Sequence, residues 1–438
     1  MSDALEEAAQ AITLVEGALS GVRLLPSFLG ADGTKTYYLA MQNNADQRAT
    51  GGAVLAYAFI QISNGHLSLV DGGAIGHIDE QYGFPGASLP PQLKWYVDHI
   101  HRPQAYARLA NINFSPDFPV VAGTWATLAE KATGRKIDGA IAIDPIAISY
   151  LLGKRKIDVP SYPQPITGDN AVAVIENDQY RLDYPSQAAF PGQVIAAAWQ
   201  IFQDPSPLVR TMKQMALALK ERHIQIWSTD PDQQGQLATL GWDGAVDIGS
   251  GDYLFVTDSK LRSNKVDFYT HLAIDYQVTV DAAGGIRSTC AVTVTNDTPP
   301  DQPRFIVGPN AYGLNAALIS VLAPGEAELE EVDPRSKFPD HSDGEARVFT
   351  RELDVLPGEP QSTTFTYTVP GVVTASVAGR VYRLTIQHQA MVNLPDLSVT
   401  VTLPPGVSVL QAPGWTVSGN VATFHTSLGQ DLVLEIVY

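Results

Sequence analysis

The hydrophobic pattern of this chain changes near residue 265, and the change divides the fold into two kinds of structure. Before it, apolar residues at helical spacing alternate with short apolar runs, which is the pattern of helices and strands in turn. After it, apolar and polar residues alternate one by one over residues 267–297, and similar runs continue to Tyr438 between Gly, Pro and Asp turns. The sequence therefore predicts an α/β segment followed by an all-β segment.

The 438 residues are long enough for two or three domains. We predict an amphipathic helical stub over residues 1–30 and an α/β domain over residues 31–262, with a central mixed sheet flanked by helices. Residues 263–438 are predicted to form one β-sandwich, or two that divide near residue 370.

Local signals predict the elements of the α/β segment. Asn64-Gly65 is a favourable hairpin turn between two apolar runs. A helix is predicted from Ala122 to Lys131, where Gly134 stops it, and a short buried strand follows at 137–144. Further strands are predicted at 36–42, 53–62, 66–70 and 224–229, and further helices at 90–110, 169–180, 190–203 and 207–223.

Composition excludes several classes of site. The net charge is −18 and Lys and Arg are scattered, so the sequence predicts neither a nucleic-acid surface nor an anionic-membrane surface. Cys290 is the only cysteine, which rules out an intrachain disulfide and a cysteine metal site, and predicts a buried strand residue. His99 and His101 are two apart in a helical pattern and do not share a face. No phosphate-binding loop occurs. We therefore predict no metal and no cofactor.

Polar residues gather at the strand ends and loops of the α/β segment. Taken singly, each is more simply a structural residue. Taken together, they combine carboxylates, amides, one Arg and aromatic faces, as sugar-binding sites do. Pro116 and Pro119 stiffen the loop that carries Asp117, which either serves a site or caps the next helix. The candidates are Asn44, Arg48, Asp71, Trp95, Asn113, Asp117, Glu176, Asp178 and Tyr180.

Five segments resemble the bacterial envelope family catalogued as domain of unknown function 4012. They are QNNADQRATGG, NFSPDFP, IDGAIAIDPIAI, ITGDNAVAVIENDQY and NKVDFY, in that order along nearly the whole chain. Members of that family are typically membrane-anchored. The resemblance therefore implies an extracytoplasmic protein of the cell envelope, reaching the membrane only through an anchor that is absent from this chain.

A more distant resemblance is to the LytR-CpsA-Psr phosphotransferases, which attach glycopolymers to cell walls. It is carried by RATGGAVLAYAFI, ANINFS and AVAVIEND, over roughly residues 35–200, with Arg48 at the family's arginine. The departures are chemical. Thr50 stands where the family has its metal-binding Asp, and Glu176 and Asp178 stand where it has the arginines that hold pyrophosphate. Carboxylates there repel a pyrophosphate, whereas a glycan pocket remains compatible with them.

We therefore predict a glycoside hydrolase or transglycosylase acting on bacterial surface polysaccharide. Asp117 and Glu176 are the expected catalytic pair, with Asp71 as the substitute for either. Arg48, Asn44, Asn113, Asp178, Trp95 and Tyr180 are the expected substrate-binding residues. Two alternatives stay open: a LytR-CpsA-Psr-like phosphotransferase with rearranged residues, and a non-catalytic envelope protein that binds glycan.

Overall fold

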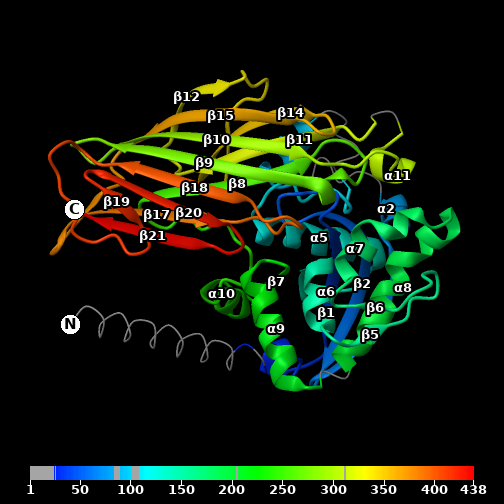
Figure 1. The fold of residues 1–438 in the computed structure, drawn as a ribbon. Helices are drawn as coiled ribbons and strands as arrows, with labels where there is room; N and C mark the ends of the chain where they lie inside the picture. Colours follow the sequence, from blue (N-terminus) through cyan, green and yellow to red (C-terminus); the bar gives the residue numbers. More distant parts are fainter. Residues whose placement is uncertain (1–23, 25, 83–88, 101–107, 204–205, 310–311) are drawn as a thin grey trace.

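The computed structural model describes residue 24 and residues 26–82, 89–100, 108–203, 206–309 and 312–438. A β-rich body formed by the C-terminal half lies against a helix-flanked sheet formed by the N-terminal half (Figure 1). This arrangement confirms the expected change from a helix-flanked sheet to strand-rich structure along the chain. Most of the predicted N-terminal helix, residues 1–30, lies outside the described residues.

The N-terminal sheet has five strands in the order β3-β2-β1-β4-β7. β1 and β4 are parallel and the remaining pairs are antiparallel, so the sheet is mixed, as predicted. Asn64 and Gly65 both have positive φ in the β2–β3 turn, as a tight hairpin requires. The strands are β1 (Lys35–Asn43), β2 (Ala53–Ser63), β3 (His66–Ala74), β4 (Gly139–Ile143) and β7 (Ile224–Ser228).

Helices cover both faces of this sheet. Tyr37 and Leu39 of β1 pack with α6, α7 and α8, whereas Tyr38 and Ala40 pack with α2, α3 and α5 on the other face. A strand buried on both faces loses its polar alternation, which explains the continuous apolar run. The helices are α2 (Ile75–Tyr82), α3 (Pro91–His99), α5 (Phe118–Thr133), α6 (Pro145–Leu152), α7 (Ala171–Glu176), α8 (Tyr184–Gln203), α9 (Leu208–Lys220) and α10 (Pro231–Thr239).

Two predicted helix boundaries can be compared with the structure. α5 ends where expected, because Gly134 takes a left-handed conformation and its N–H bonds to the carbonyl of Glu130. The helix begins at Phe118, four residues before the predicted start, with Pro119 in its first turn. Short pieces complete this half: the paired strands β5 (Lys156–Ile157) and β6 (Ile166–Thr167), and the 3₁₀ helix η2 (Asp178–Arg181).

The C-terminal half is a sandwich of two sheets. One has the order β12-β15-β10-β9-β18-β20-β19 and the other β13-β14-β11-β8-β17-β16, with β21 also paired to β17. The strands are β8 (Asp252–Lys260), β9 (Thr270–Val280), β10 (Ile286–Asn296), β11 (Asn315–Ala323), β12 (Glu328–Asp333), β13 (His341–Asp343), β14 (Ala346–Val355), β15 (Pro360–Val369), β16 (Thr374–Ser376), β17 (Gly379–Gln387), β18 (Asp396–Thr402), β19 (Thr416–Ser418), β20 (Val421–Ser427) and β21 (Leu432–Val437). The short helices η3 (Val266–Tyr269) and α11 (Arg304–Val307) lie among them.

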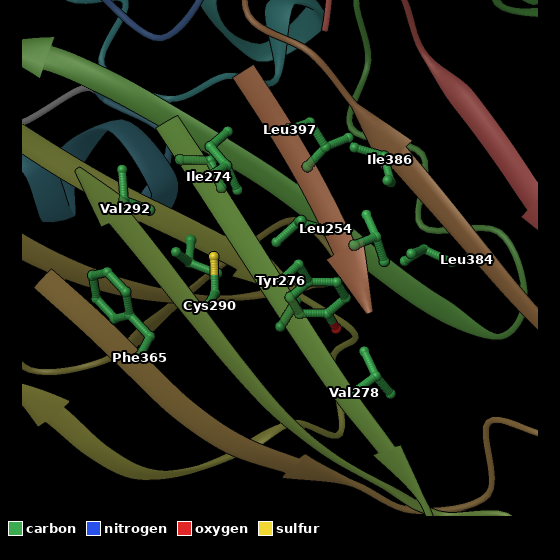
Figure 2. Close-up of a cluster of buried hydrophobic side chains, with 14 of the residues drawn as sticks. Leu254, Ile274, Tyr276, Val278, Cys290, Val292, Phe365, Leu384, Ile386 and Leu397 are labelled. Atoms are coloured by element: carbon green, nitrogen blue, oxygen red, sulfur yellow. The ribbon is translucent and has the colours of Figure 1, made fainter. Parts of the chain in front are cut away.

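The sandwich core forms from the inward-facing residues of both sheets. Strand β9 alternates buried and exposed residues along its whole length, as its sequence predicts. Figure 2 shows Tyr276, Val292 and Phe365 of one sheet with Leu254 and Leu384 of the other. Cys290 is buried in the same cluster, as expected.

The structure differs from the predicted organisation in two places. β8 was expected in the α/β domain because it precedes residue 262, yet it pairs with β11 and β17 of the sandwich. The region is also not divided near residue 370. β18 pairs with β9 and β17 pairs with β8, so strands from both sides of that residue share each sheet and a single core.

Candidate binding site at the junction of the two regions

The loop between β1 and β2 is the centre of the junction. Residues 44–52 are all buried, although their side chains are largely polar. The sandwich supplies their partners: Gln47 N–H donates to Asp267 (2.7 Å), and the Gln389 amide donates to the Gln47 side chain (3.1 Å) and to the Arg48 carbonyl (2.8 Å). Buried polar groups need such partners, so this loop joins the two regions.

Charged residues of the junction are paired with each other. Lys265 contacts Asp46 at 2.8 Å, Arg48 contacts the same carboxylate at 2.9 Å, and Lys260 contacts Asp267 at 2.7 Å. Burial alone raises a carboxyl pKa, but the charges of Lys265 and Arg48 outweigh it and lower the pKa of Asp46 to about 2. Asp46 therefore stays ionised at every physiological pH.

The predicted hydroxyl-binding residues Arg48, Asn44 and Asn113 lie in this buried layer. Arg48 is 4% exposed and also donates to the Asn111 side chain. The Asn44 amide contacts the Asp144 carboxylate (3.2 Å) and the Ala390 carbonyl (3.3 Å). The Asn113 amide contacts Gln42, Thr50 and Gly52 within 2.9 Å. Their donor groups therefore bind protein in this structure, whereas the side-chain oxygens of Asn44 and Asn113 are buried and accept no hydrogen bond from the described residues.

Glu176, one of the two predicted catalytic carboxylates, is fully buried at the end of α7. Its two oxygens accept from the backbone N–H groups of Asn44 (3.0 Å) and Ala45 (2.7 Å). Burial raises the pKa of Glu176 to about 8, although the two backbone hydrogen bonds oppose the shift. Its contacts hold the loop of residues 44–52 in place.

Asp117, the other predicted catalytic carboxylate, lies in a different environment. Its oxygen accepts from the Val246 N–H (3.3 Å), and its side chain makes no capping bond to α5. Burial raises the pKa of Asp117 to about 6, with the charge of Asp243 adding to the shift and Arg222 opposing it. No described contact joins this group to Glu176 or Arg48, so the fold does not bring the expected pair together.

The remaining predicted residues are dispersed. Asp71 is on the edge strand β3, 3.6 Å from Arg135. The Trp95 ring stacks on His341 of the sandwich, with centroids 3.5 Å apart. Asp178 is half-buried and accepts from the neighbouring Asn177 amide (3.2 Å). Tyr180 lies behind the wall of a pocket: its ring stacks on Phe305, with centroids 5.6 Å apart, and Phe305 lines that pocket.

A pocket of about 450 Å³ lies where the junction opens to solvent. Asp46 comes from the α/β half and the other wall residues come from the sandwich half. Phe305 is 50% exposed, and Lys265 and Arg304 line the same space. We call this the junction pocket; its walls are Asp46, Ser263, Asn264, Lys265, Arg304, Phe305, Gly308 and Pro309.

Most of the junction pocket carries no motif that the sequence alone indicates. Of its wall, only Asn264 and Lys265 fall in a segment that was singled out, as the start of NKVDFY. The available signal was an Arg-Phe pair, Arg304 and Phe305, in a stretch rich in Pro and Gly, where an aromatic ring has no core to join.

Two features are absent from the described residues. These residues contain no group of three or more His, Cys, Asp or Glu side chains that could hold a metal ion. They also contain no helix that is long and apolar enough to cross a membrane.

Comparison with solved structures gives only weak similarities. A proposed nutrient-binding protein from Legionella pneumophila has a TM-score of 0.28 and 10% identity, over 43% of this chain and 72% of that one. Yeast LTA4 hydrolase has a TM-score of 0.24 and 9% identity, over 39% and 29% of the two chains. An M1 zinc metallopeptidase from Deinococcus radiodurans has a TM-score of 0.21 and 12% identity, over 38% and 41%. These scores are too low to indicate a shared fold.

No curated protein matches the chain. One family model does, and it covers the central sheet strands β1 to β4 and the loop of residues 44–52. Four of the five motifs singled out in the sequence fall inside the matched segment, and NKVDFY lies beyond it. Residues 32–180 match the family described as "Protein of unknown function (DUF4012)", which confirms over that segment the resemblance that the motifs indicate.

Proposed function

We propose that this chain is a glycan-binding protein of the bacterial envelope and that the junction pocket is its binding site. One observation carries the proposal: the half-exposed ring of Phe305, backed by Tyr180, lies in one wall with charged and amide side chains around it. A pyranose ring has an apolar C–H face and a rim of hydroxyl groups. A fixed aromatic ring suits the face, and convergent polar groups suit the rim.

The charges of the pocket favour an acidic glycan. Lys265 is neutralised by Asp46, whereas Arg304 makes no ion pair with another described residue. A guanidinium presents a planar pair of donors that matches a carboxylate or a phosphate. A sugar that carries a uronic acid or a phosphate group is therefore the preferred ligand.

The pocket supports binding more directly than hydrolysis. Asp46 is the sole carboxylate among its described wall residues, and its pKa of about 2 means that it cannot donate a proton at neutral pH. Glycoside hydrolysis normally needs an acid and a second carboxylate on opposite sides of the bond. Hydrolysis stays an alternative proposal centred on Asp117, because a pKa of about 6 suits a general acid.

The binding proposal is tested by calorimetric titration with acidic and neutral envelope oligosaccharides. Phe305→Ala should weaken binding about tenfold, since stacking contacts of this kind contribute about 1–1.5 kcal/mol. Arg304→Ala should weaken acidic ligands more than neutral ones. Tyr312→Ala is the matched control, because this ring is 90% exposed on the same segment but lines a different hollow.

The outcome also separates the alternatives. Binding that is unchanged in Phe305→Ala would exclude the junction pocket. Release of shorter oligosaccharides by the unmodified chain, lost in Asp117→Asn, would favour hydrolysis instead. In that case Phe305→Ala would affect KM, and Asp117→Asn would affect kcat.

A further inference from the structure

The outward face of α9 combines exposed apolar residues with lysines. Val209 is 69% exposed and Met212 is 58% exposed, and Leu208 lies beside them. Lys213 and Lys220 project from the same side of the helix, because their spacing from Val209 is four and eleven residues. Side chains of this size are usually buried, so a helix face of this composition indicates a partner surface.

The fold adds more cations beside this face. Lys154, Arg155 and Lys156 follow α6, which packs against α9. The Arg210 guanidinium fills the space next to Gly153, so the start of α9 and this cationic run are in contact. We call these residues the α9 patch: Lys154, Arg155, Lys156, Leu208, Val209, Arg210, Met212, Lys213 and Lys220.

The fold brings together cations that are separated in the sequence, so the patch departs from the expectation that scattered Lys and Arg provide no surface for an anionic membrane. The patch holds six cations, and the acidic residues nearest to it in sequence are Asp158, Asp204 and Glu221, of which Glu221 accepts a hydrogen bond from Tyr150. Lys154, Lys156, Lys213 and Lys220 form no ion pair with other described residues. The chain as a whole carries −18, but charges beyond about 8 Å are largely screened at physiological salt.

We infer that the α9 patch binds the anionic surface of a lipid bilayer. Leu208, Val209 and Met212 enter the boundary between headgroups and acyl chains, while the lysines remain at the level of the lipid phosphates. A nucleic acid would engage the cations but would leave these apolar side chains in water. The mixture of exposed apolar and basic groups therefore favours a lipid surface over a nucleic acid.

The α9 patch extends along one side of the α/β half. α6 begins next to the junction and runs away from it, so Lys154, Arg155 and Lys156 lie at the end remote from the sandwich. The other end of the patch, at Lys220, lies nearer the junction, because Arg222 contacts Asp431 of the sandwich at 2.8 Å. The sandwich stands on the far side of the junction (Figure 1). This inference is independent of the glycan proposal.

The test is co-sedimentation of the full chain with lipid vesicles. We expect binding to vesicles of phosphatidylcholine mixed with phosphatidylglycerol, little binding to phosphatidylcholine alone, and release at about 1 M salt, where the Debye length is near 3 Å. Each cation near an anionic bilayer changes partitioning roughly fivefold. Lys213→Glu with Lys220→Glu should therefore weaken binding at least about tenfold, and Val209→Ser with Met212→Ser should weaken it while the charge is unchanged.

Matched controls carry the same chemical changes elsewhere. Lys131→Glu alters an exposed lysine on α5, and Leu410→Ser alters an exposed leucine of the sandwich; neither should change vesicle binding. Circular dichroism confirms that each variant is folded. Equal binding to neutral and anionic vesicles, or no effect of the α9 variants, would overturn the inference. So would binding to double-stranded DNA that the serine variants leave intact, or a dimer of this chain that they abolish.

Discussion

The two halves of the molecule bury polar groups in different ways. In the sandwich, Asp252 accepts from Tyr276 (2.9 Å) and Tyr382 (2.6 Å), which belong to strands of the same body. In the α/β half, the buried polar loop of residues 44–52 takes essential partners from the other half, such as Asp267 and Gln389. The Asp252 network is therefore complete within the sandwich, whereas the loop of residues 44–52 obtains these partners only when the sandwich is docked.

This difference changes the interpretation of the polar residues at the strand ends. In an isolated α/β domain, amides and carboxylates at the carboxyl end of the strands face an open crevice, where ligands bind. Here the sandwich covers that end, and Asn44 and Arg48 bind protein groups. The site that remains open is at the rim of the covered surface, where both halves contribute walls.

Removing Lys260 should have the largest effect on the stability of the buried polar network at the junction. Lys260→Met leaves Asp267 buried without its cation, and breaking a buried pair typically costs about 3–5 kcal/mol. We expect that loss in the free energy of unfolding, measured with urea. Lys131→Met, on an exposed surface, should change it by less than about 0.5 kcal/mol. A small effect of Lys260→Met would show that the sandwich side of the junction does not depend on this pair.

A second contact between the two halves should make the stability of the protein depend on pH. Asp343 of the sandwich lies 3.5 Å from the Tyr96 hydroxyl of α3, and burial raises the pKa of this carboxyl from 3.8 to about 7. The pKa of Asp343 is therefore higher in the folded state than in the unfolded state. Its protonated form stabilises the folded protein fully below pH 3.8, and this stabilisation is lost as the pH rises through 7.

We therefore expect the unfolding free energy to fall between about pH 4 and pH 8, measured by urea titration at each pH. Asp343→Asn should remove about 2–4 kcal/mol of this fall, because a tenfold difference in proton affinity between the folded and unfolded states corresponds to about 1.4 kcal/mol. Asp340→Asn, at a more exposed position beside Arg347, should leave the slope nearly unchanged. A slope that is equal in the two variants would exclude Asp343 as its source.

The hairpin at Asn64 and Gly65 should show the smallest effect, because it lies at the end of the α/β half that is remote from the sandwich. Gly65 has φ of +77° and open space where a side chain would stand, so Gly65→Ala introduces strain without a clash. We expect a loss of about 1 kcal/mol in thermal or urea unfolding. Gly235→Ala, in the interior of α10 with equally open space, should instead be neutral or stabilising.

Local sequence patterns predicted much of the fold. The elements that they did not predict depend on contacts between residues far apart in the sequence. Gly134 and the Asn64-Gly65 turn act within a few residues, and the alternation of β9 reflects one buried face. β8 gave no such pattern, because all nine of its residues are buried and its place in the sandwich depends on β11 and β17.

The candidate site was harder to predict for the same reason. Gln389 bonds to Gln47 across 342 positions, and nothing in either segment alone indicates that contact. The residue types typical of a sugar site were present, but amides and carboxylates serve equally well as partners for a buried loop. Of the predicted residues, Tyr180 lies against the junction pocket, and it does so through its contact with Phe305.

The pairing of β8 with β17 has a consequence for the order in which the protein can be completed during synthesis. β8 lies beside β11 and β17 in its sheet, and β17 begins at residue 379. Until that strand has emerged, one side of β8 has no partner, and Gln389 is not available to the loop of residues 44–52. Contacts over such separations form slowly and leave strand edges exposed to other chains. The polar loop of the α/β half and one edge of β8 therefore stay uncovered until the final stage of translation. This interval is the period when assistance from chaperones matters most.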